Sequence, residues 1–161
     1  MILVLLGAPG AGKGTQAEAL ATATGAAHIA TGDLFRAEIA AGSALGLEAK
    51  SFIDAGKLVP DAVTIGMISS RLAEPDARNR VILDGFPRNV AQAEALDAAL
   101  AHSARNATAI LLEVDRDALV ARISGRRICS ECGRSYHFTK NPPKHEGTCD
   151  TCADRKSTRL N

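Results

Sequence analysis

The sequence predicts a doubly wound α/β fold, in which a parallel sheet is covered by helices on both faces. Short apolar runs alternate along the chain with longer segments of helix-forming residues. Apolar runs without a polar residue at every second position are typical of strands buried on both faces. Strands that alternate with helices are the units from which parallel sheets are built.

The strands are expected where a short apolar run is followed at once by turn-forming residues. Glycines follow the first run, and Asp84 and Gly85 follow the third. The expected strands cover residues 2–6, 28–30, 81–83 and 109–114.

The helices are expected between these strands, where good helix formers are continuous. Thr31 and Asp33 offer side-chain caps for one helix, and Asp61 offers one for another. Residues 57–60 should be extended, because a residue that precedes proline avoids the helical conformation. The expected helices begin near residue 16 and then cover 34–41, 45–55, 61–72, 92–101 and 117–126.

The composition fits one soluble domain with a small appendage. The chain has 161 residues, of which 46% are hydrophobic and 23% are charged. The net charge of +1 provides no overall field to attract nucleic acid or an anionic membrane. The apolar run 2–6 is too short to span a bilayer and has no basic segment ahead of it. We therefore expect a cytoplasmic protein with neither a nucleic-acid nor a membrane partner.

Residues 128–161 differ from the rest of the chain and should form a small separate unit. They are polar, rich in turn residues, and contain all four cysteines. Cys129 and Cys132 form one CxxC pair, and Cys149 and Cys152 form a second one after sixteen intervening residues. This spacing suits a tetrahedral site of four thiolates. A zinc ion held there would be structural, because no coordination position stays open.

Two other interpretations of the cysteines are open. A disulfide pair is one, although disulfides are rare in cytoplasmic proteins. A nucleic-acid-binding zinc ribbon is the other, although the residues between the pairs include few basic ones and a single tyrosine. The four histidines show no metal-ligand spacing with each other, so we assign no catalytic role to His28, His102, His137 and His145.

The strongest local signal is the segment Gly7-Ala-Pro-Gly-Ala-Gly-Lys-Gly-Thr15 between a predicted strand and a predicted helix. Glycines allow backbone N–H groups to converge on phosphate oxygens, and Lys13 adds a full positive charge. Gly14 stands where the general phosphate-loop pattern has serine or threonine. A plain glycine-rich turn is the alternative, but it would not require this spacing and this context together.

This loop and three later segments resemble the adenylate kinases and the related nucleoside monophosphate kinases. The loop reads GxPGxGKGT, Thr31 to Arg36 reads TGDLFR, and Asp84 to Arg88 reads DGFPR, with Gln92 shortly after it. The segment from Arg122 to Arg127 resembles the arginine-bearing helix that leads to the family's lid. The resemblance extends from Ile2 to about Cys152 and implies the reaction ATP + AMP = 2 ADP.

The resemblance also implies a role for individual residues. The ATP contacts would come from Gly10, Ala11, Gly12, Lys13, Gly14, Thr15, Arg122, Arg126, Ser135 and Tyr136. The AMP pocket would be formed by Thr31, Arg36, Lys57, Leu58, Val59, Gly85, Phe86, Pro87, Arg88 and Gln92. Asp33 and Asp84 would hold waters of the Mg²⁺ ion that accompanies ATP. The structural Zn²⁺ would be bound by Cys129, Cys132, Cys149 and Cys152.

The chemistry of phosphoryl transfer agrees with these roles. Charge spreads over the equatorial oxygens of the transferred group, so the enzyme needs positioned cations more than a nucleophile. Arginine suits this task because its planar fork meets phosphate oxygens in pairs. The cations assigned to catalysis are Lys13, Arg88, Arg122 and Arg126. A purely solvated role for Arg126 and a turn-capping role for Asp84 are the plainer alternatives.

The expected organisation is that of a long-form, zinc-lid adenylate kinase. The phosphate-loop core would comprise residues 1–30 and 60–124, with an AMP-binding insertion at 31–59 and a lid at 125–161. Residues 153–161 depart from the family pattern, although Arg159 is in register with a family arginine that contacts phosphate. From this we expect a C-terminally truncated monomer that lacks the last strand and helix. The alternatives are a kinase for another nucleoside monophosphate and a non-catalytic fragment that binds nucleotide and zinc.

Overall fold

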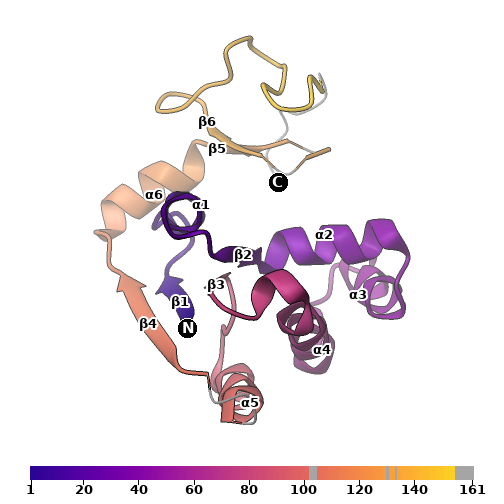
Figure 1. Cartoon of the computed structure of the whole chain (residues 1–161). Coiled ribbons are helices and arrows are strands. Elements are labelled where there is room, and N and C mark those ends of the chain that lie inside the picture. Colours follow the sequence, from indigo (N-terminus) through magenta and orange to yellow (C-terminus); the bar gives the residue numbers. More distant parts are fainter. Residues whose placement is uncertain (102–104, 130, 133, 155–161) are drawn as a thin grey trace. The chain divides into compact units, whose positions relative to one another are not determined.

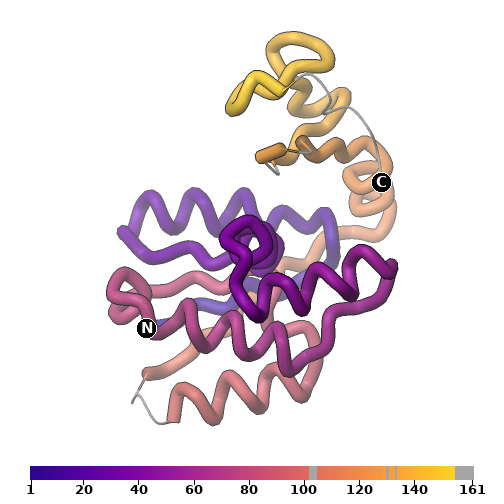
Figure 2. The backbone as a smooth tube through the Cα atoms, turned by 90° about the vertical axis from the view of Figure 1, so that its right-hand side faces the viewer, coloured from indigo at the N-terminus to yellow at the C-terminus, as the bar shows by residue number. Residues whose placement is uncertain are grey.

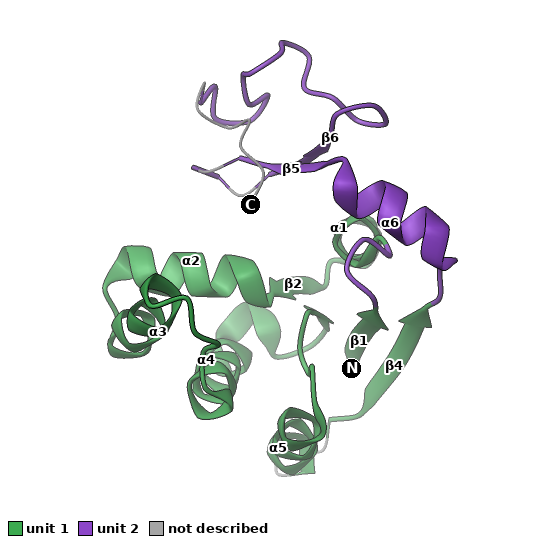
Figure 3. Ribbon diagram, turned by 180° about the vertical axis from the view of Figure 1, so that it is seen from behind, with its two compact units in different colours: residues 1–7, 12–112 green, residues 8–11, 113–161 purple. Residues whose placement is uncertain are grey.

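The computed structural model describes residues 1–101, 105–129, 131–132 and 134–154. It confirms the predicted α/β class, because strands and helices alternate along the chain. His102, Arg159 and the other residues of the segment 155–161 lie outside the described residues. The chain divides into two compact units, residues 1–7 with 12–112 (unit 1) and residues 8–11 with 113–161 (unit 2), as Figure 3 shows.

Unit 1 contains a four-stranded parallel sheet in the order β2-β3-β1-β4. The predicted parallel arrangement is therefore confirmed. Its strands are β1 (Ile2–Gly7), β2 (Ala27–Ala30), β3 (Val81–Asp84) and β4 (Ala107–Leu112). The strand predicted at 109–114 lies two residues earlier, because the register with β1 pairs Ala107 with Ile2 and Leu112 with Gly7.

Helices connect these strands, and the residues predicted to cap two of them lie inside the helices. Thr31 is the first residue of its helix and not a cap, since Ala30 takes the N-cap position. Asp61 likewise begins its helix after Pro60 and makes no capping hydrogen bond. The helices are α1 (Lys13–Thr24), α2 (Thr31–Ala41), α3 (Ala44–Asp54), α4 (Asp61–Ala73) and α5 (Val90–Ala101), with the short 3₁₀ helix η1 (Pro75–Ala77).

The sheet separates two apolar clusters, because successive side chains of a strand point to opposite faces. Leu5 and Ile82 pack with Ala17 of α1 on one face. The other face carries the larger cluster, to which α4 and α5 contribute Met67, Ile68, Leu96 and Leu100. Figures 1 and 2 show α1 and α5 on opposite sides of the sheet. The two faces are thus covered along the inner strands, whereas the side chains of β4 are mostly exposed.

Two helical glycines of unit 1 predict opposite effects on stability. A Cβ atom at Gly46 would lie 2.2 Å from the carbonyl oxygen of Glu38, since α3 packs against the backbone of α2. A Cβ atom at Gly66 would be 3.4 Å from a methyl group of Leu45, which is an ordinary contact. We expect Gly46→Ala to lower the free energy of unfolding by about 1–3 kcal/mol. Gly66→Ala should raise it by about 0.4–1 kcal/mol, because alanine restricts the unfolded chain.

Urea denaturation of the two variants and the parent chain checks this pair of predictions. Both substitutions add one methyl group to a helix, so Gly66→Ala controls for the gain in helix propensity at Gly46. Equal stability of the two variants would show that α2 and α3 do not pack as closely as the structure indicates.

Unit 2 contains the helix α6 (Arg116–Ser124) and the antiparallel hairpin of β5 (Arg126–Ile128) and β6 (Ser135–His137). The side chain of Asp115 caps α6 by accepting hydrogen bonds from two backbone N–H groups. The predicted helix 117–126 ends at Ser124, and Arg126 belongs to a strand. Gly125 is the C-cap of the helix, and only glycine fits there, because a Cβ atom would lie 2.2 Å from Nε2 of His137. None of the helices in the described part of the chain has the length and apolarity needed to cross a bilayer.

Candidate active site and lid metal centre

The carboxyl ends of β2 and β3 bring together residues of two predicted AMP-binding segments. Thr31 is buried and donates a hydrogen bond from Oγ1 to the carbonyl oxygen of Asp84, at 3.2 Å. A Cβ atom at Gly85 would lie 3.3 Å from that hydroxyl oxygen and 3.2 Å from Nη2 of Arg88. Glycine at this position therefore allows the hydroxyl and the guanidinium to approach the same turn. Open α/β sheets bind their ligands at this end of the strands.

Arg88 and Gln92 are held by a hydrogen-bond network that the sequence did not reveal. The carbonyl oxygen of the Gln92 side chain accepts from the backbone N–H of Arg88, at 2.8 Å. Its amide nitrogen donates to Asp61 at 2.6 Å, and Asn89 donates to both oxygens of the same carboxylate. Nε of Arg88 donates to the carbonyl oxygen of Gly85 at 2.7 Å. Asp61 thus fixes the buried Gln92, a role that its position as a predicted cap did not suggest.

The start of α1 lies beside the predicted magnesium residue Asp84. A Cβ atom at Gly14 would be 3.3 Å from Oδ2 of Asp84, so the carboxylate lies close to the first turn of the helix. Nε2 of His28 is 3.9 Å from the same oxygen, and this buried nitrogen has no hydrogen-bond partner among the described residues. Lys13 donates from Nζ to the carbonyl oxygen of Gly7, at 2.9 Å. A lysine and a carboxylate therefore lie at this edge of the sheet, as predicted.

Among the other predicted AMP residues of unit 1, Phe86 is buried in the core, whereas Arg36 and Lys57 to Val59 are exposed or partly buried. Arg36 and Asp33 form an exposed ion pair within α2. Lys57 is exposed, Leu58 is 94% exposed, and Val59 is partly buried against the core. Asp33 is therefore paired with a predicted AMP-binding arginine. A contribution of Asp33 to a magnesium site stays a prediction.

Part of the phosphate loop, residues 8–11, belongs to unit 2 and lies against α6. Nη1 of Arg122 donates to the carbonyl oxygen of Gly10, at 3.4 Å. Gly10 has a φ of +82°, and a Cβ atom on it would meet the Ile123 side chain at 3.0 Å. Both the backbone conformation and the close approach of α6 require glycine. The structure thus brings Arg122 to a residue that we predicted to bind ATP.

The lid hairpin presents its predicted ATP-binding residues on two faces. Nε of Arg126 donates to the hydroxyl of Ser135, at 3.0 Å, so these two side chains share one face. Tyr136 is paired in register with Arg127 and points to the opposite face, since side chains alternate along a strand. Its ring is buried, at 6% exposure. Any nucleotide contact from Tyr136 should therefore involve its backbone.

The four cysteines come together as predicted and could hold one metal ion. Their four sulfur atoms all lie within 4.8 Å of one another. The Cys129 and Cys152 sulfurs are 3.5 Å apart, and so are those of Cys132 and Cys149. A tetrahedral zinc site with Zn–S bonds of about 2.3 Å has sulfurs about 3.8 Å apart. All four cysteines are free thiols, which does not support the disulfide alternative.

The environment of the thiols differs within the cluster. A hydrogen bond from the Tyr136 hydroxyl, together with backbone N–H groups, lowers the pKa of Cys149 to about 6 despite its burial. A backbone hydrogen bond from Asp154 lowers the pKa of Cys152, but burial and the neighbouring thiols outweigh it and raise that pKa to about 12. Cys149 therefore loses its proton more readily than Cys152. Four thiolates together require a bound cation to offset their charge.

Comparison with known proteins agrees with this arrangement. The family model described as adenylate kinase matches residues 5–160 of the chain. The chain belongs to the adenylate kinase family. An adenylate kinase of Lysinibacillus sphaericus is 54% identical over 160 residues, which is 99% of this chain and 74% of the relative. Relatives of the same name from a Geobacillus species and from Clostridium perfringens are 53% and 51% identical, each over 94% of this chain and 71% of the relative.

These matches confirm the predicted family and fold class. They also confirm the predicted kind of enzyme, a phosphotransferase of the nucleoside monophosphate kinase class. The four-cysteine cluster supports the prediction of a metal site, such as a zinc site, in this segment. The assignment of single residues to ATP, AMP or magnesium stays a prediction, as do the boundaries of core, insertion and lid.

Proposed function

We propose that this chain catalyses the reversible transfer of a phosphoryl group from ATP to AMP, which gives two molecules of ADP. The main support is the group of Thr31, Asp84, Gly85 and Arg88 at the carboxyl end of the sheet, next to the first turn of α1. Such an arrangement offers one anion site at the helix start and a second at the adjacent strand ends. This is what a reaction between two phosphate-bearing nucleotides needs.

The proposed role of the four cationic side chains is to stabilise the negative charge of the phosphate groups during transfer. Lys13 would follow the transferred phosphoryl group, and the guanidinium of Arg88 would hold the AMP phosphate. Arg122 and Arg126 would contact the ATP phosphates, each with the paired donors that arginine offers. None of these side chains would form a covalent bond with the substrate, so each would act as a positioned charge.

Mg²⁺ would neutralise part of the ATP phosphate charge when it is bound. The position of Asp84 fits this role, because its carboxylate lies beside the first turn of α1 and offers the hard oxygen ligands that Mg²⁺ prefers. Asp33 would be a further partner through water. Zinc is the metal we propose for the four cysteines, where it would hold the lid together without taking part in the chemistry. A cytoplasmic location and a monomeric state stay predictions.

Initial rates with different acceptors test the proposed substrate. With ATP as donor, we expect the purified chain to phosphorylate AMP faster than UMP, CMP or GMP at equal concentrations. The hydrogen-bonding groups predicted to meet the purine edge come from Thr31 and Gln92. In this structure the Gln92 side chain accepts a hydrogen bond from Arg88 and donates one to Asp61. If another monophosphate is phosphorylated faster, that nucleotide is the preferred acceptor and the proposal of AMP is wrong. The assignment as a kinase would not change.

A further inference from the structure

Tyr136 occupies the centre of the lid in a way that its predicted role does not explain. It is buried with Cys129 and Cys149, which are 1% and 2% exposed, and these three residues form the apolar core of the described lid. Arg126 and Ser135 lie on the other face of the hairpin. The tyrosine side chain is therefore directed at the cysteine cluster.

The hydrogen bonds of the Tyr136 hydroxyl indicate where its proton points. The backbone N–H of Asp150 donates to the hydroxyl oxygen, at 2.8 Å. The same oxygen lies 3.3 Å from Sγ of Cys149. Because the Asp150 N–H can only donate, the hydroxyl accepts there and its own proton is available for the sulfur. The backbone N–H of Thr151 is a second donor to Cys149, at 3.4 Å.

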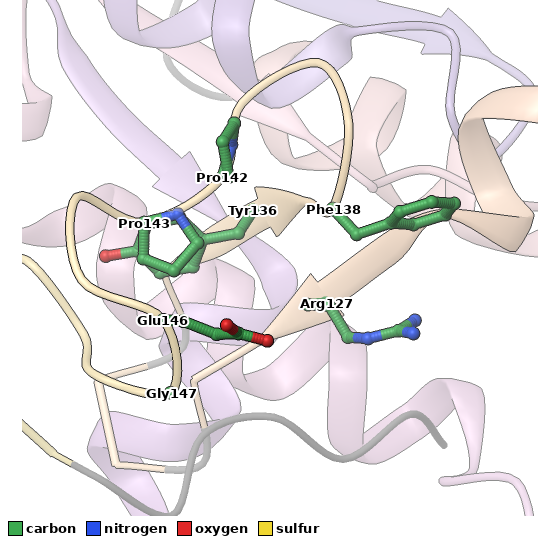
Figure 4. Close-up of a pocket in the computed structure, with 7 residues that line it drawn as sticks. All are labelled: Arg127, Tyr136, Phe138, Pro142, Pro143, Glu146 and Gly147. Atoms are coloured by element: carbon green, nitrogen blue, oxygen red, sulfur yellow. The ribbon is translucent and has the colours of Figure 1, made fainter.

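The same tyrosine lines a cavity of about 540 Å³ within the lid. Pro143 and Glu146, labelled with Tyr136 in Figure 4, also line this cavity and belong to the segment 142–147. The backbone N–H of Lys144 donates to Oδ1 of Asp150, at 2.9 Å. Tyr136 and Asp150 thus join the cavity wall to the second CxxC pair.

We infer that Tyr136 is a positioning residue of the metal centre, whose hydroxyl donates to the Cys149 sulfur and links that ligand to the cavity wall at 142–147. A donor to a metal-bound thiolate fixes the orientation of the ligand and disperses part of its charge. Partners of this kind commonly change metal affinity by about 10- to 100-fold. The inference rests on the proposed zinc centre and goes beyond it, since four thiolates alone need no tyrosine.

Zinc competition with a chromophoric chelator tests the role of the hydroxyl in the full chain under reducing conditions. Tyr136→Phe keeps the ring and removes one oxygen, so we expect zinc to dissociate about 10- to 100-fold more readily from the variant. Phe138→Leu is the control, because Phe138 also lines the cavity but is 58% exposed and has no side-chain group that could donate a hydrogen bond to a sulfur. Its zinc affinity should equal that of the parent chain. An affinity for Tyr136→Phe within about threefold of the parent would overturn the inference.

The intrinsic fluorescence of the parent chain provides a second readout that does not depend on a variant. The sequence has one tyrosine and no tryptophan, so the emission reports Tyr136 alone. In chelator-stripped protein we expect the lid to be unfolded, so added zinc should bring the Tyr136 hydroxyl to the Cys149 sulfur. A hydrogen bond from the phenol to a thiolate quenches tyrosine emission, so we expect the emission to fall and to saturate at one equivalent of zinc.

The outcomes of the two measurements separate the inference from the metal centre. Zinc binding without a change in emission would leave the metal centre intact and overturn the role of Tyr136. No zinc binding by the parent chain would overturn both.

Discussion

Replacing Lys13 by alanine should reduce turnover by at least about 100-fold, which is the effect of removing one positioned donor from a developing anion. The ammonium group lies at the first residue of α1, where it donates to the Gly7 carbonyl at the base of the phosphate loop. A neutral methyl group at this position cannot offset the charge on the transferred phosphoryl group. Folding should change little, because the Lys13 side chain is only partly buried.

The rate of ADP formation by the full chain measures this effect, with a thermal melt of each variant alongside. Lys50→Ala is the matched control, because Lys50 forms an exposed ion pair with Asp54 in α3 and is not among the residues predicted to bind substrate. Exposed pairs of this kind contribute little to stability. Turnover of Lys13→Ala within a few-fold of the control would contradict the role of the lysine.

Removal of the metal should unfold the lid while unit 1 stays folded. The apolar core of the described lid consists of Cys129, Tyr136 and Cys149, too few residues to hold it together without a cation. Elemental analysis should find about one zinc per parent chain and almost none in Cys149→Ser. In the chelated protein or this variant, limited proteolysis should cut between residues 129 and 152. Thr151→Ser is the control, because it keeps all four ligands and the backbone donor to Cys149.

The acid sensitivity of the metal site follows from its thiols. Zinc binds thiolates, so every thiol that is protonated in the metal-free lid must release its proton when zinc binds. The pKa of Cys152 is raised to about 12, and that of Cys149 is lowered to about 6. Zinc affinity should therefore rise with pH across the neutral range.

Metal-free protein that resists proteolysis as well as the zinc-loaded form would show that the metal does not stabilise the lid.

The sequence predicted the elements that depend on local patterns. The strands were found because each is a short buried apolar run, and the phosphate loop because its glycines and lysine have a fixed spacing. The cysteine cluster was found for the same reason. Errors occurred where a distant residue takes part: Gly125, which follows the last residue of α6, lies against the His137 ring of the following hairpin.

Contacts between distant residues also account for what the sequence did not reveal. Asp61 holds Gln92, 31 positions away, and the Tyr136 hydroxyl reaches Cys149, 13 positions away. Neither pair has a characteristic spacing, because turns and intervening helices set the distance. From the sequence alone, the aspartate is expected to cap a helix and the tyrosine to contact a nucleotide. Only the folded arrangement of α4 with α5, and of the hairpin with the second CxxC pair, shows what these side chains do.

Phosphorus NMR of the purified chain with ATP, AMP and Mg²⁺ is the most direct test of the proposed reaction. It resolves the phosphates of ATP, AMP and ADP in one sample. We expect two ADP molecules to appear for each ATP and AMP consumed, with no inorganic phosphate. The same mixture should form when the reaction starts from ADP alone. No ADP, or inorganic phosphate released from ATP at the same rate with and without AMP, would contradict the proposal that this chain is a kinase acting on AMP.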